Sequence, residues 1–352
     1  MSALADPRTG LRDVEPYVSP QLDVAARLNT NECPHPLPAG FFKELVEAVR
    51  DLPLHRYPDA QMTRLREELS AATGHPADGI WAANGSNEIL TQLLQAYGGP
   101  GRVAVTFEPT YLLHARLCWL TQTEHRMLSL PANFVLGEPQ VAAALDLAPD
   151  VVFVCSPNNP TGNAQPLSAI VALAEALPHS LVIVDEAYVE FSPAASAQTL
   201  LPQHPNVVIV HTFSKAFALA GARIGYVLAS PAVVEDLARV RLPYHLSALT
   251  QTAGVVALRH RAEATSLLEA IRVQRDRMTR ELRSLPGTTV YPSDANFVLF
   301  VPAGDAAAVW QGLLDRGVLV RDMTAVVPNA LRVTAGSEHE TDLFLQAIKE
   351  IG

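Results

Sequence analysis

The 352-residue chain is 49% hydrophobic and 18% charged, a composition typical of a globular protein with a large core and one large or two moderate domains. Its formal net charge of −10 argues against nucleic acid or an anionic membrane surface as the main partner. The cysteines, Cys33, Cys118 and Cys155, form no C-x-x-C pair, and the first residues contain no apolar signal segment. We therefore expect a cytoplasmic protein with reduced thiols and no metal site.

The first thirty or so residues, rich in Pro and Asp, predict an extended arm, and apolar spacing then predicts helices at 39–52 and 63–74. Short, β-branched apolar runs follow at 102–108, 151–156, 181–188 and 207–214. Such runs are typical of strands buried on both faces of a mostly parallel sheet. Ligands of open α/β sheets gather beyond the carboxyl ends of the strands, so we expect the active site there.

The pattern changes after Pro243. A long helix is predicted at about 250–285, followed by shorter strands in "NFVLFV", "GVLVRD" and "ALRVTAG". We therefore expect an α/β fold with two domains. Residues 51–243 would form the large domain, and residues 1–50 and 244–352 would form the arm and a smaller α+β domain.

Several common catalytic motifs are missing from the sequence. No Gly-Lys pair exists for a phosphate-binding loop of the Walker type, and neither G-x-S-x-G nor H-E-x-x-H occurs. "GPGRVA" at 99–104 precedes a predicted strand, whereas a dinucleotide fingerprint follows one. The sequence therefore lacks the usual motifs of nucleotide-binding proteins, hydrolases and metalloproteases.

Polar residues follow several of the predicted strands, and each has an ordinary explanation when taken alone. Asp185 suits a helix cap or a metal carboxylate, and Tyr188 suits a partly buried tyrosine. Asn159, in "SPNNPTG", suits a turn, although its amide also suits a ligand oxygen. Ser86, in "GSNEIL", suits a helix cap, although a helix start also offers free N–H groups to an anion.

Lys215, in "HTFSKAFALAGARIGY", is one of only three lysines, and it lies just after an apolar strand. Thr212, Ser214 and Arg223 around it are typical phosphate ligands. Together with Asp185, these groups match pyridoxal 5′-phosphate, which needs an amine for a Schiff base, a carboxylate for its ring nitrogen and several phosphate donors. A lysine can also move protons as a general acid and base, whereas arginine stays protonated.

At this point the chain resembles the fold-type I pyridoxal-phosphate aminotransferases, from about residue 27 to residue 350. "NPTG", "VDEAY" and "SKAFALAGARIGY" carry the resemblance to the fold. "HRYPD", "DANFVLF" and "GVLVRD" make it most similar to the histidinol-phosphate aminotransferases. The resemblance implies a mostly parallel seven-stranded sheet with helices on both faces, a smaller α+β domain and a homodimer.

The resemblance also implies residue roles. Lys215, Asp185 and Tyr188 would be catalytic. The cofactor would be bound by Ser86, Asn87, Tyr111, Asn159, Asp185, Tyr188, Thr212, Ser214, Lys215, Arg223 and, from the neighbouring subunit, Tyr57. The substrate would be bound by Arg332, Arg321, Asn159 and Tyr244.

The reaction implied is transfer of an amino group between L-glutamate and imidazole acetol phosphate, giving L-histidinol phosphate and 2-oxoglutarate. Two alternatives remain open: an aromatic amino-acid aminotransferase, and a decarboxylase of an O-phosphorylated amino acid. One residue departs from the pattern. Cys33, in "NTNECP", stands where the family usually has Asn or Tyr, so a tyrosine contact to the substrate phosphate is absent.

Overall fold

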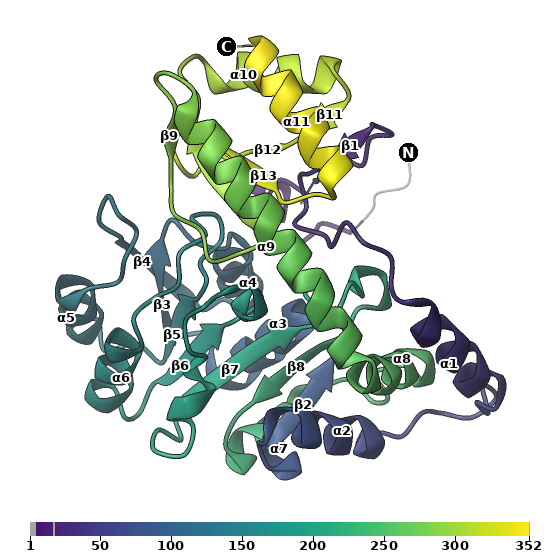
Figure 1. The fold of residues 1–352 in the computed structure, drawn as a ribbon. Coiled ribbons are helices and arrows are strands. Elements are labelled where there is room, and N and C mark those ends of the chain that lie inside the picture. Colours follow the sequence, from purple (N-terminus) through teal and green to yellow (C-terminus); the bar gives the residue numbers. More distant parts are fainter. Residues whose placement is uncertain (1–4, 17, 352) are drawn as a thin grey trace.

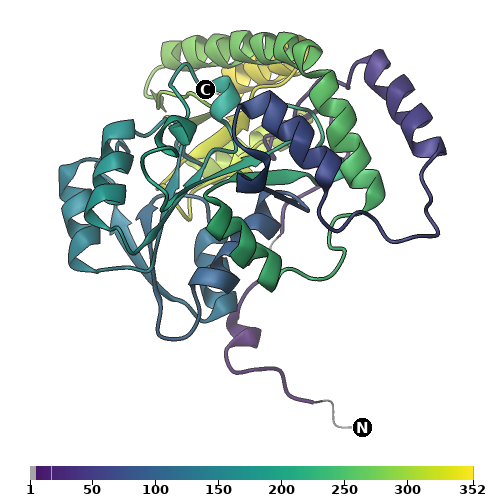
Figure 2. The same cartoon turned by 90° about the horizontal axis from the view of Figure 1, so that it is seen from below.

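The computed structural model describes residues 5–16 and 18–351 of the chain. They form a large body and a smaller body, and the long helix α9 runs from one to the other (Figure 1). Viewed from below, the first described residues, from residue 5 onward, run outward from the large body (Figure 2). None of the helices in this part of the chain has the length and apolar character needed to cross a membrane.

The large body is built on a seven-stranded sheet with the order β2-β8-β7-β6-β5-β3-β4. β7, β6, β5, β3 and β4 are parallel to one another, whereas β8 is antiparallel to both of its neighbours. The prediction of a mostly parallel sheet is therefore confirmed. The antiparallel strand β8 was not among the strands predicted from the apolar runs. The strands are β2 (Ile80–Ala83), β3 (Val103–Glu108), β4 (Glu124–Ser129), β5 (Val151–Cys155), β6 (Leu181–Asp185), β7 (Val207–Thr212) and β8 (Gly225–Leu228).

Helices cover both faces of this sheet, which is why every residue of β5, β6 and β7 is buried. These three strands consist almost entirely of β-branched and other apolar residues, as buried parallel strands require. The helices of the large body are α1 (Ala39–Arg50), α2 (Thr63–Thr73), α3 (Ser86–Tyr97), α4 (Leu113–Thr121), α5 (Glu138–Asp146), α6 (Leu167–Ala176), α7 (Pro231–Val240) and α8 (Ala248–Arg259).

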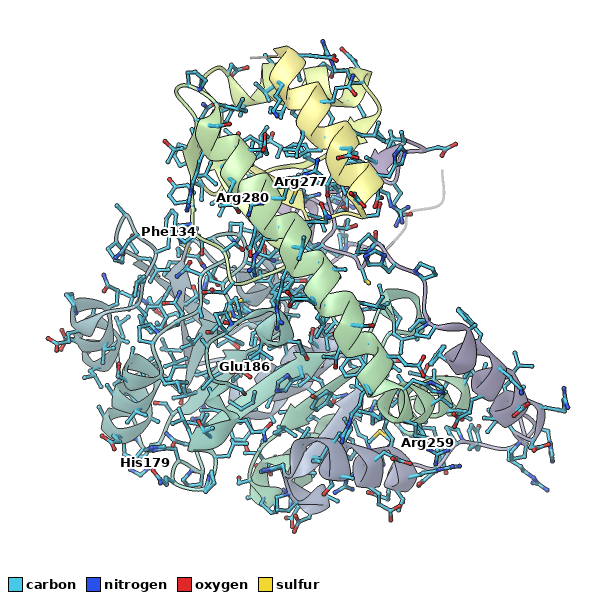
Figure 3. The ribbon with its side chains drawn as sticks, in the orientation of Figure 1. Phe134, His179, Glu186, Arg259, Arg277 and Arg280 are labelled. Carbon is cyan, nitrogen blue, oxygen red and sulfur yellow. The ribbon has the colours of Figure 1, made fainter. Side chains whose placement is uncertain are left out.

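The smaller body combines a four-stranded antiparallel sheet with a two-stranded parallel one. The first contains β9 (Thr289–Val290), β10 (Phe297–Val301), β12 (Arg321–Asp322) and β13 (Leu331–Thr334), and the second pairs β1 (Ala26–Arg27) with β11 (Val318–Leu319). Its helices are α9 (Arg261–Ser284), α10 (Ala306–Asp315) and α11 (Glu338–Ile351). Arg277 of α9, labelled in Figure 3, donates to Asp342 of α11 at 2.5 Å.

The helix predicted at about 250–285 is broken into α8 and α9. His260, at the break, has a non-helical ψ of 15°, and its two ring nitrogens lie 3.0 Å from carboxylate oxygens of Glu44 and Glu263. The break has a packing reason, because α8 lies against α1 and α2 whereas α9 runs on to the smaller body.

The hydrophobic core of the large body includes Phe41 of α1 and the buried residues of α8. The sequence-based division at 50/51 and 243/244 assigns both helices to the smaller domain. The core of the smaller body instead begins along α9, at Leu268, and continues through β10, β13 and α11. The break at His260 therefore separates α8, in the first core, from α9, in the second, and the second core also includes Tyr188, Phe191 and Ala216.

Candidate active site

The predicted site residues converge at the carboxyl ends of three adjacent parallel strands. Asp185 ends β6, Thr212 ends β7, and Asn159 lies in the loop that follows β5. Lys215 comes three residues after Thr212 and therefore starts from the same edge of the sheet. This is the edge at which open α/β sheets bind their ligands.

Asp185 is almost fully buried, and a histidine that the sequence analysis missed lies beside it. Nε2 of His114 is 3.4 Å from Oδ2 of Asp185. The His114 ring stacks on Phe153 with the centroids 4.5 Å apart and meets the Tyr111 ring edge-on at 5.6 Å. His114 thus connects the predicted ring-nitrogen carboxylate with the predicted stacking tyrosine. Its only sequence signal is its place three residues after Tyr111, at the start of a helix.

Lys215 is half-buried, and its Nζ donates a hydrogen bond to the carbonyl oxygen of Thr30 at 2.9 Å. The pKa of Lys215 is lowered from 10.5 to about 7, mainly by burial and also by the positive charges of Arg332 and Arg223, against the opposing effect of Glu32. A neutral amine is therefore accessible near neutral pH. Such an amine is a nucleophile and a proton acceptor, as the predicted chemistry requires.

The start of α3 presents backbone N–H groups to the same edge. Gly85 precedes the helix with a φ of +81°, a conformation that glycine adopts without strain, and Ser86 is the first helical residue. The first N–H groups of a helix have no partner within it, so this turn suits an anion. The Tyr111 hydroxyl donates to Oδ1 of Asn87 at 3.4 Å, which places the stacking tyrosine beside this turn.

The segment from Thr212 to Arg223 folds back on itself opposite that helix start. Oγ1 of Thr212 donates to Oγ of Ser214 at 3.0 Å, and Nη1 of Arg223 donates to the same Ser214 oxygen at 3.2 Å. Nη1 of Arg223 also donates to the carbonyl of Ala220 at 3.1 Å. Two hydroxyls and a guanidinium are thereby held together, which is the donor set that a phosphate requires.

Two glycines allow these elements to approach each other closely. A Cβ on Gly85 would lie 2.6 Å from Nη2 of Arg223, and a Cβ on Gly225 would lie 2.3 Å from the backbone nitrogen of Ser86. Any larger residue at either position would displace Arg223 or the helix start. The start of α3, together with Thr212, Ser214 and Arg223, is called the phosphate cup. The residues present fit pyridoxal phosphate, because they supply this donor set, the Asp185 carboxylate and the Lys215 amine at one edge of the sheet.

Arg332, on β13, connects the smaller body to this site. Its Nη1 donates to Oδ1 of Asn159 at 2.5 Å, and its Nη2 donates to the carbonyl oxygen of Asn29 at 2.9 Å. The guanidinium is buried and lies over the Phe297 ring, 5.1 Å from its centroid. Arg332 and Asn159, both predicted to bind the substrate, therefore lie in contact.

Tyr188 is buried, and its hydroxyl accepts a hydrogen bond from Nδ2 of Asn31 at 3.0 Å. Burial raises the pKa of Tyr188 to about 12, so it remains a neutral phenol. Asn31 has a φ of +54° and is fixed by Thr334, whose Oγ1 donates to Oδ1 of Asn31 at 3.1 Å. The sequence analysis did not single out Asn31 or Thr334, and the polar run "NTNE" was the available signal.

Arg321 lies at the edge of the smaller sheet, in register with Arg332. Its Nη1 donates to the carbonyl oxygen of Val18 at 3.3 Å and to Oγ of Ser19 at 3.4 Å. The predicted second substrate arginine is thus held by the N-terminal segment.

Tyr57 and Tyr244 lie together on the surface of the large body. Their rings stack with centroids 4.4 Å apart and planes 11° apart. Tyr57 is 80% exposed and Tyr244 is 45% exposed, and the exposed apolar residues Leu54, Leu242 and Leu249 belong to the same two chain segments or adjoin them. The structure therefore groups Tyr244 with Tyr57, the residue predicted to serve a neighbouring subunit.

Cys33 lies in the N-terminal segment that passes over Lys215. It is half-buried, and its Sγ donates a weak hydrogen bond to the carbonyl oxygen of His35 at 3.6 Å. A cavity of about 400 Å³ opens here between residues 22–34, 214–221 and 334–340, with Glu32, Cys33 and Ser214 in its lining. The residue that replaces the usual Asn or Tyr therefore borders open space beside the site.

Glu186, immediately after Asp185, belongs to a buried group beneath the site. Its two carboxylate oxygens accept hydrogen bonds from Oγ of Ser196 at 2.6 Å and from the backbone nitrogen of Ala197 at 2.7 Å, and Nε2 of His211 lies 3.6 Å away. Burial raises the pKa of Glu186 to about 7 and lowers that of His211 to about 4. Figure 3 shows Glu186 within the large body, far from Arg277 on α9.

Known proteins match nearly the whole chain. Residues 25–348 match the family model described as aminotransferase class I and II. Histidinol-phosphate aminotransferases of Frankia casuarinae and Mycolicibacterium smegmatis are 49% and 48% identical to it, over 97% and 98% of this chain and 89% and 93% of those proteins. The crystal structure of histidinol-phosphate aminotransferase from Sinorhizobium meliloti with pyridoxal-5′-phosphate is similar with a TM-score of 0.88 and 26% identity, covering 99% of this chain and 98% of that one. The chain therefore belongs to the class I and II aminotransferases, in their histidinol-phosphate aminotransferase branch, and has their fold-type I architecture.

Proposed function

We propose that the protein transfers an amino group between L-glutamate and imidazole acetol phosphate, giving L-histidinol phosphate and 2-oxoglutarate, with pyridoxal 5′-phosphate as cofactor. The observation that carries the proposal is the convergence of Lys215, Asp185, Asn159 and Arg332 at one edge of the sheet. Together they provide an amine, a carboxylate, an amide and an anion-binding arginine. The relatives that bear the same activity name span nearly the full length of the chain.

Bound pyridoxal phosphate supplies an aldehyde that captures amines and a ring that accepts electrons from the substrate Cα. The backbone nitrogens at Ser86 and Asn87, the hydroxyls of Thr212 and Ser214 and the Arg223 guanidinium would hold its phosphate. Asp185, oriented by His114, would hold the proton on the ring nitrogen. Tyr188 and Asn159 would bind the ring oxygen, and Tyr111 would stack on the ring.

Lys215 would carry the proton of the reaction. Its Nζ would take the proton from the substrate Cα and hold it as a general acid and base. The lowered pKa of Lys215, about 7, leaves much of the amine unprotonated at neutral pH, so it can accept that proton. The carbonyl of Thr30 would orient Nζ by accepting its hydrogen bond.

Arg332 would bind the acidic group of either substrate, with Arg321 nearby on the adjacent strand. Planar forked donors suit both a carboxylate and a phosphate, and the two substrates present one or the other at this position. Cys33 offers neither charge nor a strong donor, so phosphate recognition would fall to the two arginines. Tyr244 would approach the substrate pocket from the neighbouring subunit, as Tyr57 would approach the phosphate.

The proposal includes a homodimer, because Tyr57 and Tyr244 stack as exposed aromatic rings on the surface, where a second copy of the chain would cover them. It also includes a two-domain enzyme, with α1 and α8 assigned to the large domain because their apolar residues join its core. We place the enzyme in the cytoplasm, where the free thiols Cys33, Cys118 and Cys155 would stay reduced.

Single half-reactions of the cofactor-loaded protein test the substrate. L-histidinol phosphate, L-phenylalanine and O-phospho-L-threonine are added separately, and amino transfer to the cofactor is followed by absorbance while carbon dioxide is measured. We expect complete conversion at low L-histidinol phosphate and far higher concentrations for phenylalanine. Preferential conversion by phenylalanine would identify an aromatic aminotransferase. Release of carbon dioxide from O-phosphothreonine without amino transfer would identify a decarboxylase.

A further inference from the structure

A hydrogen-bonded network runs from the phosphate cup to the surface tyrosines. Glu88, in the first turn of α3, turns back so that its Oε2 accepts from the backbone nitrogen of Asn84 at 2.7 Å and from Asn84 Nδ2 at 2.6 Å. Its Oε1 accepts from Nε2 of Gln92 at 3.2 Å, and Gln92 Oε1 accepts from Nε1 of the fully buried Trp81 at 3.0 Å. The carboxylate thereby fixes the turn that presents Ser86.

The same Asn84 side chain reaches a second segment, more than 150 residues away. Its Nδ2 also donates to the carbonyl oxygen of His245 at 2.8 Å. The His245 ring lies parallel to Trp81 with centroids 5.4 Å apart, and its Nε2 is 2.9 Å from the carbonyl oxygen of Ala82. His245 is therefore fixed on both sides, by Asn84 and by β2.

Tyr244 precedes His245 and has a φ of +53°, a left-handed conformation that is unfavourable for a tyrosine. Contacts around it must hold that conformation, and the neighbouring His245 is the residue that the network anchors. The Tyr244 ring in turn stacks on Tyr57. A continuous path thus joins the turn that would bind one protomer's phosphate to the tyrosine pair on the surface.

We propose that Asn84 and Glu88 are positioning residues that couple the phosphate cup of one protomer to the tyrosine pair that it offers to its partner's cofactor. The inference rests on the proposed dimer, in which Tyr57 reaches the partner's phosphate. Its new content is that the cup and the tyrosine pair are not independent. Breaking the network at Asn84 would loosen both the phosphate cup of the same protomer and Tyr57, which would contact the cofactor of the partner.

A double-mutant cycle on cofactor affinity tests the coupling. The dissociation constant for pyridoxal phosphate is measured by equilibrium dialysis on the cofactor-free dimer for the wild type, Asn84→Ala, Tyr57→Phe and the double variant. We expect each single change to weaken binding by about tenfold, the effect of one hydrogen bond to a charged group. In the double variant, binding should be weakened much less than hundredfold, the product of the two single effects, because Asn84→Ala already displaces Tyr57.

Asn206→Ala is a matched control. Asn206 also uses its side-chain amide to join backbone carbonyls of separate segments, those of Ala174, Leu177 and Ser180, at the other end of the strands. It should lower stability without changing cofactor affinity. Glu88→Gln weakens the same network in a chain of unchanged volume, since its amide nitrogen replaces one of the two oxygens that accept from Asn84 and from Gln92. It should change cofactor affinity in the same direction as Asn84→Ala.

Each outcome has a distinct meaning. If the double variant weakens binding by the full product of the two single effects, the cup and the tyrosine pair act independently and the coupling is wrong. If Tyr57→Phe alone leaves the affinity unchanged, the contribution of Tyr57 across the dimer fails, and the coupling fails with it. If Asn206→Ala reduces the affinity as much as Asn84→Ala does, the network acts only through general stability.

Discussion

The two halves of the proposed active site are assembled in different ways. In the large domain, Thr212, Ser214 and Arg223 contact one another over at most eleven residues of chain, beside Asp185 at the end of an adjacent strand. In the smaller domain, Arg332 contacts Asn159 and Asn29, which are 173 and 303 residues away. The cofactor half thus follows directly from the strand ends, whereas the substrate half requires three distant segments to meet.

This difference implies that the two halves can be disrupted separately. Changes in the large domain should alter cofactor chemistry or affinity. Changes at Arg332 or Asn31 should instead alter substrate use while the cofactor stays bound. Substitutions in each half, measured for turnover and for cofactor affinity, test that separation.

Lys215→Ala should reduce turnover by at least about 10⁴-fold, because it removes both the nucleophilic amine and the general acid and base. The phosphate cup does not include the Lys215 side chain, so the variant should still bind pyridoxal phosphate. Steady-state turnover and cofactor content measure both effects. Lys349→Ala, which removes an exposed lysine paired with Glu281, is the control and should leave turnover unchanged. Substantial turnover by Lys215→Ala would remove the basis of the mechanism.

Arg332→Lys should lower kcat/KM by about 100-fold, since a buried, hydrogen-bonded charge contributes about 2–5 kcal/mol and lysine cannot form the forked contact. Cofactor affinity should stay within about threefold of the wild type, because loss of packing at a distant site changes the free energy of cofactor binding by under about 1 kcal/mol. Steady-state kinetics and dialysis separate the two quantities. If the variant instead binds the cofactor much more weakly but has the wild-type kcat/KM at saturating cofactor, the cofactor half and the substrate half are not separate.

Glu186→Gln should flatten the pH dependence of stability. The folded protein raises the pKa of Glu186 to about 7, so between about pH 4.5 and 7 it holds a proton that the unfolded chain releases. This stabilisation is present below pH 4.5 and is lost as pH rises through 7. From pH 5 to 8 the wild type should lose about 2 kcal/mol more than the variant. Denaturant unfolding at both pH values measures this, with Glu190 and His211 present in both proteins. If the wild type and the variant lose the same stability between pH 5 and 8, Glu186 is ionised over this whole range.

Asn31→Ala should lower kcat/KM by roughly three- to tenfold, the effect of one or two neutral hydrogen bonds. It removes the contacts to Tyr188 and Thr334, which hold the N-terminal segment over the site. Hydrogen exchange of residues 26–34 should quicken, while exchange of β6 and β7 should not change. Faster exchange in β6 would show that the N-terminal segment also supports the cofactor half.

The same difference explains how much the sequence predicted. Lys215, Asp185 and Thr212 follow apolar strands, so their meeting at one sheet edge could be expected from the strands alone. His114 was missed because its contact with Asp185 depends on how α4 packs against β5. The contacts of Asn31 with Tyr188 and Thr334 were missed because no local pattern indicates pairings across 157 and 303 residues. The break at His260 was missed because helical spacing continues through it, and packing against α1 and α2 decides it.

The most direct test of the account is the protonation of Lys215 in the cofactor-free protein. The chain has only three lysines, so brief acetylation at a series of pH values, followed by peptide mass spectrometry, reports each separately. Lys43 and Lys349 are exposed and serve as references. The account predicts that Lys215 becomes reactive with a midpoint near pH 7, in keeping with its pKa of about 7, well below the references. A Lys215 that gains reactivity only in parallel with the two references would contradict it.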